Sequence, residues 1–266
     1  MKRTPTRLSA AAIVLALGAC ERGAPSSPDT STATEAEPKT SEVLVLGMIH
    51  DGHRESATYG VDVIKAIVRA VDPDYVLAEI PPDRLDAALA SYRATGAVDE
   101  DRVERFPEYT DAIIPLTTEM GFEIIPCAAW AREMADARRA KLAELEASRP
   151  DVSAAVELAQ TNADATITDE GLDATPLGSH TPRYDALVKE GLEPYDRLFN
   201  DELGPGGWTN INAAHYALIA NALDAHRGEG RRFLITFGSW HKYWLLEQLR
   251  ERDDVTLLSL EDFVGE

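Results

Sequence analysis

Two stretches of the chain, far apart in the sequence, end an apolar run with the same spacing of a glycine and a histidine. The first is VLVLGMIH, with Gly47 and His50, and the second is FLITFGSWH, with Gly238 and His241. A third apolar run, YVLAEI, carries a carboxylate near its end, at Glu79. Two imidazoles and one carboxylate suit a divalent ion such as Zn²⁺, Mn²⁺, Co²⁺ or Fe²⁺. Without a metal, a glutamate can hold a histidine that acts as general base on water.

These runs alternate with amphipathic segments. Strands are predicted over 43–48, 75–80 and 122–127, and helices over 59–71, 83–94 and 107–120. This alternation predicts an α/β fold, with a mostly parallel central sheet flanked by helices. Ligands of such sheets bind beyond the carboxyl ends of the strands. We therefore expect His50, Glu79 and His241 to converge at one edge of the sheet, as the catalytic residues and as the metal ligands.

A large helical insertion is predicted between strands three and four, over about 128–229. Its segment 171–183, GLDATPLGSHTPR, contains two prolines and two glycines and is predicted to be a long loop and a candidate lid, with His180 exposed. The segment 204–228 is predicted to begin with a turn and to continue as a strong helix, in which the spacing indicates that His215 is partly buried, with contact to the site as the alternative. The fourth strand (231–238), a helix (242–252) and a fifth strand (255–260) complete the domain.

The N-terminus has the pattern of an export signal. Residues 1–19 combine a basic start with a short apolar run and end in Leu-Gly-Ala before Cys20, which is typical of a lipoprotein signal peptide and a lipidated cysteine. Residues 20–41 are rich in Ser, Thr, Pro, Ala and Glu and are predicted to be a flexible tether. Residues 42–266 are then a single α/β domain. A cleaved signal peptide with a non-lipidated cysteine is the alternative.

The chain is strongly acidic. Its formal charge is −20, and removal of residues 1–19, which contain Lys2, Arg3 and Arg7 and no acid, makes it −23. Such a surface repels nucleic acid and anionic lipid headgroups, so we expect no nucleic-acid partner and contact with a membrane through the lipid anchor only. The expected location is the cell envelope, facing the periplasm or exterior. Glu21 after the cysteine favours the outer membrane over the inner one.

The residues at the three strand ends resemble a family, the TraB, TIKI and GumN group. This group is distantly related to the erythromycin esterases and to the ChaN-like haem-associated lipoproteins. The matching motifs are GMIH, LAEI and GSWH, and the resemblance covers 42–260 in outline. Members commonly open the helix before the last G-x-x-H strand with an Arg-Asn pair. Here the chain reads Trp208-Thr209-Asn210, so the asparagine is present and the arginine is missing.

The resemblance implies hydrolysis more strongly than it implies a metal. TIKI-type proteins are described as metal-dependent proteases, whereas the erythromycin esterases use histidine and glutamate to activate water. It also suggests Asn210 as a polar contact to substrate.

Further residues near the predicted site are candidates for substrate binding. His53 and Arg54 follow His50 in HDGHRES, where His53 could act as a ligand or proton relay and Arg54 could steady a carboxylate or an oxyanion. Trp240 could form a wall of the pocket, with core packing as the alternative. Ser239 does not lie in a G-x-S-x-G motif, which argues against a serine nucleophile elbow.

Two functions from different classes follow. The first is a lipid-anchored extracytoplasmic hydrolase, metal-dependent, that cleaves an ester or peptide bond of a small-molecule or peptide substrate with water activated at His50, Glu79 and His241. The second is a non-catalytic lipoprotein that binds haem or a metal at the same place. The polar character of the predicted site favours the hydrolase, and the missing arginine slightly favours the binding protein.

Overall fold

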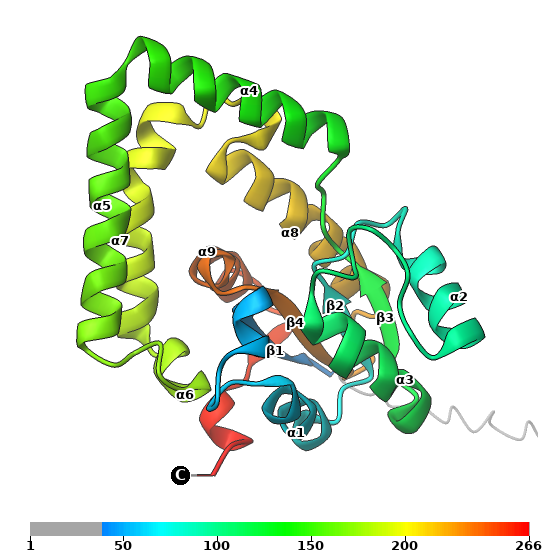
Figure 1. Ribbon diagram of the computed structural model, residues 1–266. Coiled ribbons are helices and arrows are strands. Elements are labelled where there is room, and N and C mark those ends of the chain that lie inside the picture. The colour runs from blue at the N-terminus through cyan, green and yellow to red at the C-terminus, as the bar shows by residue number, and fades with distance from the viewer. Residues whose placement is uncertain (1–38, 266) are drawn as a thin grey trace, which may run out of the picture. The chain divides into compact units, whose positions relative to one another are not determined.

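The structure is a computed structural model that describes residues 39–265. The predicted signal peptide, Cys20 and the tether up to residue 38 lie outside the described residues. Residues 38–266 form one compact unit. Within the described part, five parallel strands form one sheet in the order β3-β2-β4-β1-β5. Figure 1 labels the first four strands of the chain, β1 to β4, at the centre of the fold. The strands are β1 (Ser41–Met48), β2 (Tyr75–Ala78), β3 (Glu123–Pro126), β4 (Arg232–Gly238) and β5 (Val255–Leu257).

The predicted α/β class is confirmed, and the register of the sheet places the candidate residues together. β1 and β4 are neighbours, and Met48 pairs with Gly238 at their carboxyl ends. β2 lies on the other side of β4, where Ala78 pairs with Thr236. The residues that follow β1, β2 and β4 therefore leave the sheet at the same edge.

Both faces of the sheet are covered, which is why its strands are apolar throughout rather than alternating. One set of side chains, including Leu44, Leu46 and Leu234, packs with helices on one face. The alternate set, including Val43 and Phe233, packs on the other. The first face carries α1 (Val61–Val71), α2 (Leu85–Thr95) and α3 (Ile114–Met120), and the second carries α8 (Trp208–Ala225) and α9 (Ser239–Arg250).

The helical insertion between β3 and β4 is present as predicted. It contains α4 (Arg132–Ser148), α5 (Pro150–Asp169), the single turn α6 (Pro176–Ser179) and α7 (Pro182–Phe199), before α8. In Figure 1, α5 and α7 lie side by side, and α4 runs from their end back towards the sheet. Gly191 of α7 permits this close packing, because a Cβ there would lie 2.7 Å from the Cβ of Ala163.

The segment predicted as a loop over 171–183 is partly helical and fixed to the sheet. It includes α6 and the first residues of α7. His180 is partly buried rather than exposed. Its Nδ1–H faces the Pro176 carbonyl at 2.5 Å, and its Nε2 accepts the Gly47 N–H at 2.9 Å. The described residues include no helix that is both long and apolar enough to span a membrane.

Candidate functional site

The two G-x-x-H histidines and Glu79 meet at the carboxyl edge of the sheet. His50 opens a short 3₁₀ helix (His50–Arg54) after β1, and His241 lies in the first turn of α9. The Nε2 atom of His50 lies 3.9 Å from one oxygen of Glu79, and the Nε2 atom of His241 lies 3.9 Å from the other. His50 has a φ of +51°, a left-handed conformation that costs a histidine about 1 kcal/mol or more. Such strain is concentrated at functional sites in proteins.

Hydrogen bonds assign the proton positions of both histidines. Nδ1 of His50 donates to Glu108 Oε1 at 2.6 Å. Nδ1 of His241 donates to Asn212 Oδ1 at 2.7 Å, and the Asn212 amide nitrogen donates to the Trp208 carbonyl at 2.8 Å, which fixes the orientation of that amide. In the neutral imidazoles the proton is therefore on Nδ1, so both Nε2 lone pairs are free.

Both free lone pairs face the same carboxylate. Each Nε2 atom lies 3.9 Å from one Glu79 oxygen, and the neutral rings place no proton between them; Oε2 accepts a hydrogen bond from the Gly238 N–H at 2.7 Å. This arrangement is electrostatically unfavourable unless a cation, either a proton or a metal ion, lies between the groups. An imidazole whose Nδ1–H donates to a carboxylate or an amide oxygen is also the usual form of a metal-bound histidine.

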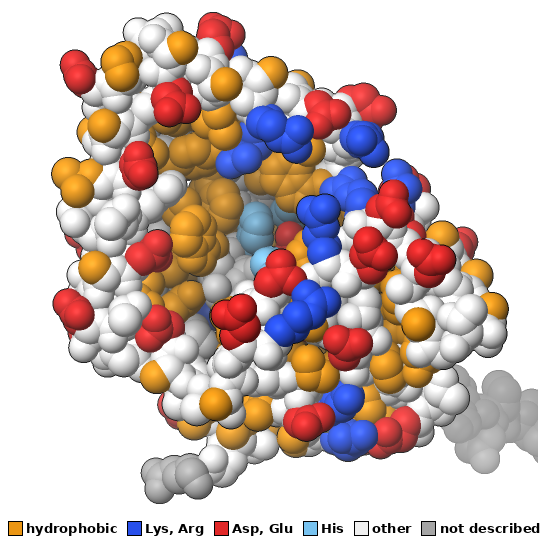
Figure 2. Space-filling view, viewed as in Figure 1, with side chains coloured by type: hydrophobic (Ala, Val, Ile, Leu, Met, Phe, Trp, Pro, Cys, Tyr) orange, Lys and Arg blue, Asp and Glu red, His pale blue; other side chains and the backbone are white. Residues whose placement is uncertain are grey.

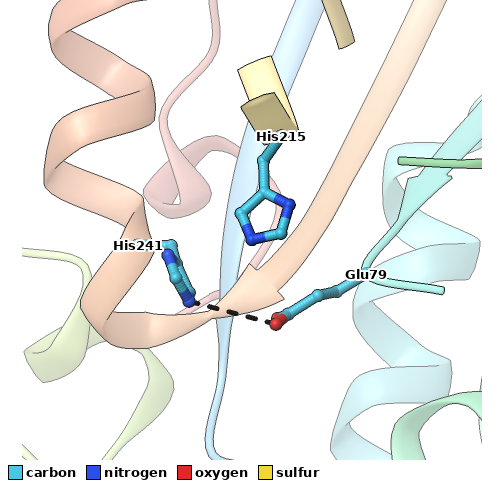
Figure 3. Close-up of side chains that lie close together, drawn as sticks. All are labelled: Glu79, His215 and His241. Carbon is cyan, nitrogen blue, oxygen red and sulfur yellow. Dashed lines mark ion pairs between the residues drawn. The ribbon is translucent and has the colours of Figure 1, made fainter. Parts of the chain in front are cut away.

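His215 is a third imidazole at this edge. Its ring, together with Glu79 and His241, offers ligand atoms within 4.8 Å of one another, and Figure 3 shows it turned towards both residues. Its Nδ1 accepts the Ala129 N–H at 2.8 Å, so in the neutral ring the proton is on Nε2. That buried Nε2 has no hydrogen-bond partner among the described residues. Burial lowers the pKa of His215 to about 4, partly opposed by the Cys127 carbonyl.

His215 therefore offers the site a proton rather than a lone pair. Its Nε2 could bind a metal only if the hydrogen bond from Ala129 were lost. Without His215, the remaining donors are His50, Glu79 and His241. The group whose ligand atoms all lie within 4.8 Å of one another is Glu79, His215 and His241, so His50 would have to move closer to share an ion with the other two. The unpartnered Nε2–H of His215 is instead suited to donate to an oxygen that gains negative charge.

The pKa values of the three groups diverge. Burial raises the pKa of Glu79, although the nearby charge of His50 opposes this. Burial holds the pKa of His241 well below its usual range, and His215 and His50 contribute in the same direction. Burial would also lower the pKa of His50, but the hydrogen bond to Glu108 and the charge of Glu79 outweigh it, so the pKa of His50 is raised.

A hollow of about 420 Å³ opens in front of these groups. Figure 2 shows it lined by hydrophobic side chains with histidine at its floor. The lining includes Met48, Ile49, Tyr184, Trp208 and Trp240 besides the two histidines. The ring of Trp208 stacks on that of His241, with 4.7 Å between centroids, and so helps to fix it.

The two glycines of the repeat have different roles. A Cβ on Gly238 would lie 2.8 Å from His50 Nε2 and 3.6 Å from Glu79 Oε2, in the space that these atoms share. The Gly238 N–H also donates to Glu79 Oε2 at 2.7 Å. A Cβ on Gly47 would instead lie 3.0 Å from the backbone Cα of Ser239. Gly238 thus keeps the site open, whereas Gly47 lets the start of α9 pack on β1.

Two of the four residues predicted to bind substrate, His53 and Arg54, have other partners. His53 is buried, and both its nitrogens bond to backbone: Nδ1 donates to the Tyr59 carbonyl and Nε2 accepts the Ile49 N–H. Arg54 is exposed and pairs with Asp51. These partners leave neither side chain free for the site.

The start of α8, which matches the family's Arg-Asn pair only at Asn210, is held by hydrogen bonds within the protein. Asn210 is exposed, and its side chain donates to the Gly204 carbonyl at 2.8 Å, so it stabilises the turn before α8. Thr209, at the position of the family's arginine, bonds to Asp196 through both its N–H and its hydroxyl. Of the four predicted substrate-binding residues, Trp240 lines the hollow and is 36% exposed.

Three residues of the site were not assigned to it from the sequence. Glu108 lies in a π-helical turn (Glu108–Ile113), a local distortion that is frequent at functional sites, and its side chain is fully buried. Asn212 and His215 are both fully buried on one face of α8, three residues apart. The polar spacing in WTNINAAH was the available signal for that pair.

Comparisons with known protein families, with curated proteins and with solved structures found no match. The resemblance to the TraB, TIKI and GumN group stays a prediction from the three motifs.

Proposed function

We propose that the protein is a hydrolase that cleaves an ester or peptide bond with water activated at His50, Glu79 and His241, and that it uses a divalent metal ion. The observation that carries this proposal is the position of the two Nε2 atoms, each 3.9 Å from a different oxygen of Glu79. Each imidazole is oriented through Nδ1 by a buried partner, Glu108 or Asn212. Together these features favour a cation shared by the three side chains.

The donor set of two imidazoles and one carboxylate fits Mn²⁺, Co²⁺, Zn²⁺ or Fe²⁺. Such an ion, held by His50, Glu79 and His241, would polarise a carbonyl and lower the pKa of water to about 7. It would also remove the repulsion between the lone pairs and the carboxylate.

The protein groups around the donors support catalysis rather than storage of a metal. The Nε2–H of His215 is buried and unpartnered within the described residues, and it faces Glu79 and His241. It can donate a hydrogen bond to the oxygen that becomes negative when a carbonyl is attacked, an interaction commonly worth about 3 kcal/mol or more of barrier. Trp208 and Trp240 line the hollow in which a substrate would lie and offer it two aromatic surfaces.

The alternative of a haem-binding protein has less support. An axial histidine would have to direct its Nε2 to the centre of a flat apolar face. Here both Nε2 atoms are directed at Glu79, which lies between them. A non-catalytic metal-binding protein would use the same donors, and turnover separates it from the hydrolase.

The test uses residues 38–266, which contain the whole sheet and its core. The protein is incubated with Mn²⁺, Co²⁺, Zn²⁺ or Fe²⁺, desalted, and analysed by elemental mass spectrometry. We expect about one ion per chain, loss of the ion in the His50→Ala, His241→Ala double variant, and retention in His226→Ala, whose side chain pairs with Glu229 away from the site. Chelation should abolish hydrolysis of p-nitrophenyl esters or of a peptide library. No ion in the wild type would overturn the metal-dependent proposal.

We also propose that Cys20 is lipidated and anchors the protein in the cell envelope. Incorporation of labelled palmitate into the full chain, and its loss in Cys20→Ser, tests this.

A further inference from the structure

A group of arginines without acidic partners lies beside the site. The chain has 46 acidic and 26 basic residues, so an arginine finds a carboxylate easily. In the described part, Arg93, Arg105 and Arg250 nevertheless have none within 4.0 Å, and neither do Arg102, Arg132 and Arg138. The last three are all associated with Trp130.

Arg138 is held in place by aromatic groups. Its guanidinium carbon lies 6.0 Å from the centre of the Trp130 ring and 5.8 Å from that of Tyr195. One terminal nitrogen donates to the Tyr195 hydroxyl at 2.8 Å. The stem packs against Gly206, where an added Cβ would lie 3.1 Å from the Arg138 Cβ. The side chain is thus fixed by cation–π contacts while most of its N–H donors have no protein partner among the described residues.

The other two arginines lie around the same tryptophan. Arg102 donates to the Trp130 carbonyl at 3.3 Å. Arg132 is exposed at the start of α4, two residues after Trp130. Both line a hollow of about 500 Å³ that Trp130 also borders. Arg84, Asp83 and Glu133 line the same hollow, so its charge is mixed with a cationic excess, and Arg138 lies beside it, over the Trp130 ring.

Trp130 joins this group to the candidate site. Its ring lies 6.2 Å from that of His215, centre to centre, and His215 faces Glu79 and His241. Figure 2 shows Lys and Arg side chains along one rim of the 420 Å³ hollow of the candidate site, and hydrophobic side chains within it, although none of these three arginines is among its lining residues. A ligand at the site could therefore place an apolar part against Trp208 and Trp240 and an anionic group at the rim.

We propose that Arg102, Arg132 and Arg138 form an anion-binding subsite, and that the substrate carries a carboxylate or phosphate close to the bond that is cleaved. This inference rests on the proposed hydrolase function. A guanidinium that is already positioned binds such anions through paired N–H donors, at a low cost in side-chain entropy. One charge-assisted hydrogen bond of this kind changes affinity by about 10- to 100-fold.

The test compares two esters of similar length, p-nitrophenyl butyrate and the mono-p-nitrophenyl ester of glutarate, on metal-loaded residues 38–266 at low salt. The wild type should hydrolyse the anionic ester with the higher kcat/KM. Arg138→Gln should lower kcat/KM for the anionic ester at least about tenfold more than for the neutral ester. The control is Arg139→Gln, which removes the same charge from the next residue of α4, an arginine whose side chain is 79% exposed and paired with Asp136.

Three results would overturn the subsite. The first is that the wild type shows no preference for the anionic ester. The second is that Arg138→Gln loses kcat/KM equally on both esters, which would indicate a structural role only. The third is that Arg139→Gln changes the preference as much as Arg138→Gln does, which would indicate an effect of bulk charge.

A binding assay separates this proposal from the hydrolase proposal. Glutarate should quench tryptophan fluorescence of the wild type but not of Arg138→Gln, and butyramide should not. Glutarate binding without turnover of either ester would refute the hydrolase and keep the subsite. Hydrolysis of both esters with equal kcat/KM, and no binding of glutarate, would refute the subsite and keep the hydrolase.

Discussion

The space between His50 and Glu79 is the feature on which the proposed function depends most directly, and Gly238 keeps it open. In Gly238→Ala, the new Cβ would lie 2.8 Å from His50 Nε2 and 3.6 Å from Glu79 Oε2, whereas those two atoms are 3.9 Å apart. The methyl group would therefore occupy the gap between them. A metal ion needs to lie about 2.0–2.2 Å from each donor atom, so the ion and the methyl group cannot both be present.

The same substitution should leave the fold largely intact. Gly238 has φ −47° and ψ 137°, which alanine adopts without strain. Alanine also lowers the entropy of the unfolded chain, a stabilising effect of about 0.4–1 kcal/mol. The contact at 2.8 Å has to be relieved by a shift of the His50 ring, at about 1–3 kcal/mol. The net loss of stability should be about 1–2 kcal/mol, while the affinity for metal falls at least tenfold.

Gly47→Ala is the matched control, because it changes the other glycine of the same motif. Its Cβ would lie 3.0 Å from the Cα and 3.1 Å from the Cβ of Ser239, so the backbone of α9 must move. No atom of His50 or Glu79 is among its nearest neighbours. We expect a loss of about 1–3 kcal/mol in stability with retention of metal by the folded protein.

Elemental analysis and calorimetric metal titration, with urea unfolding of each variant, distinguish the two effects. Gly238→Ala should lose metal with a small change in stability, and Gly47→Ala should lose stability and keep metal. Wild-type metal affinity in Gly238→Ala would refute the placement of the ion between His50 and Glu79. Equal loss of metal in both variants would indicate a general distortion of the edge instead.

Three further outcomes follow from the contacts of the site. Glu108→Gln weakens the orientation of His50 and should lower metal affinity by about 10- to 100-fold, measured by calorimetry, and an unchanged affinity would exclude Glu108 as its positioning partner. Asn212→Leu leaves the buried Nδ1–H of His241 without an acceptor and should cost about 1–3 kcal/mol in urea unfolding; an unaltered midpoint would contradict that hydrogen bond. Burial lowers the pKa of His180 to about 3. Between pH 6.5 and about 3 the unfolded chain therefore binds more protons than the folded protein does. The free energy of unfolding should fall by a few kcal/mol as the pH drops through this range. His180→Gln should flatten this dependence in unfolding curves recorded at several pH values, and a profile identical to that of the wild type would show that His180 is not its source.

The parts of the fold that were predictable from the sequence are those determined by local patterns. Each strand is a short apolar run bounded by turn residues, and each has its predicted position within a few residues. The approach of His50, Glu79 and His241 then followed from the geometry of a parallel sheet, since three strand ends share one edge. Neither inference required knowledge of side-chain packing.

The helix α7 shows where local patterns fail. It contains Gly191 and Pro194, residues that lower helix propensity, and it was predicted only as part of a helical region. Its stability comes from packing. Gly191 lies against Ala163 of α5, while Tyr184 bonds to Ser239 of α9. Such contacts between distant segments outweigh propensity but are not visible in one sequence.

The partners of the two histidines could not be predicted for the same reason, and they give the site its asymmetry. Glu108 reaches His50 from the helices on one face of the sheet, and Asn212 reaches His241 from α8 on the other. The G-x-x-H repeat by itself suggests two equivalent imidazoles. The hydrogen bond to Glu108 and the charge of Glu79 outweigh burial and raise the pKa of His50, whereas burial, together with His215 and His50, lowers the pKa of His241. The edge therefore combines one imidazole of raised pKa with one of lowered pKa, a difference that the spacing of the two G-x-x-H motifs did not reveal.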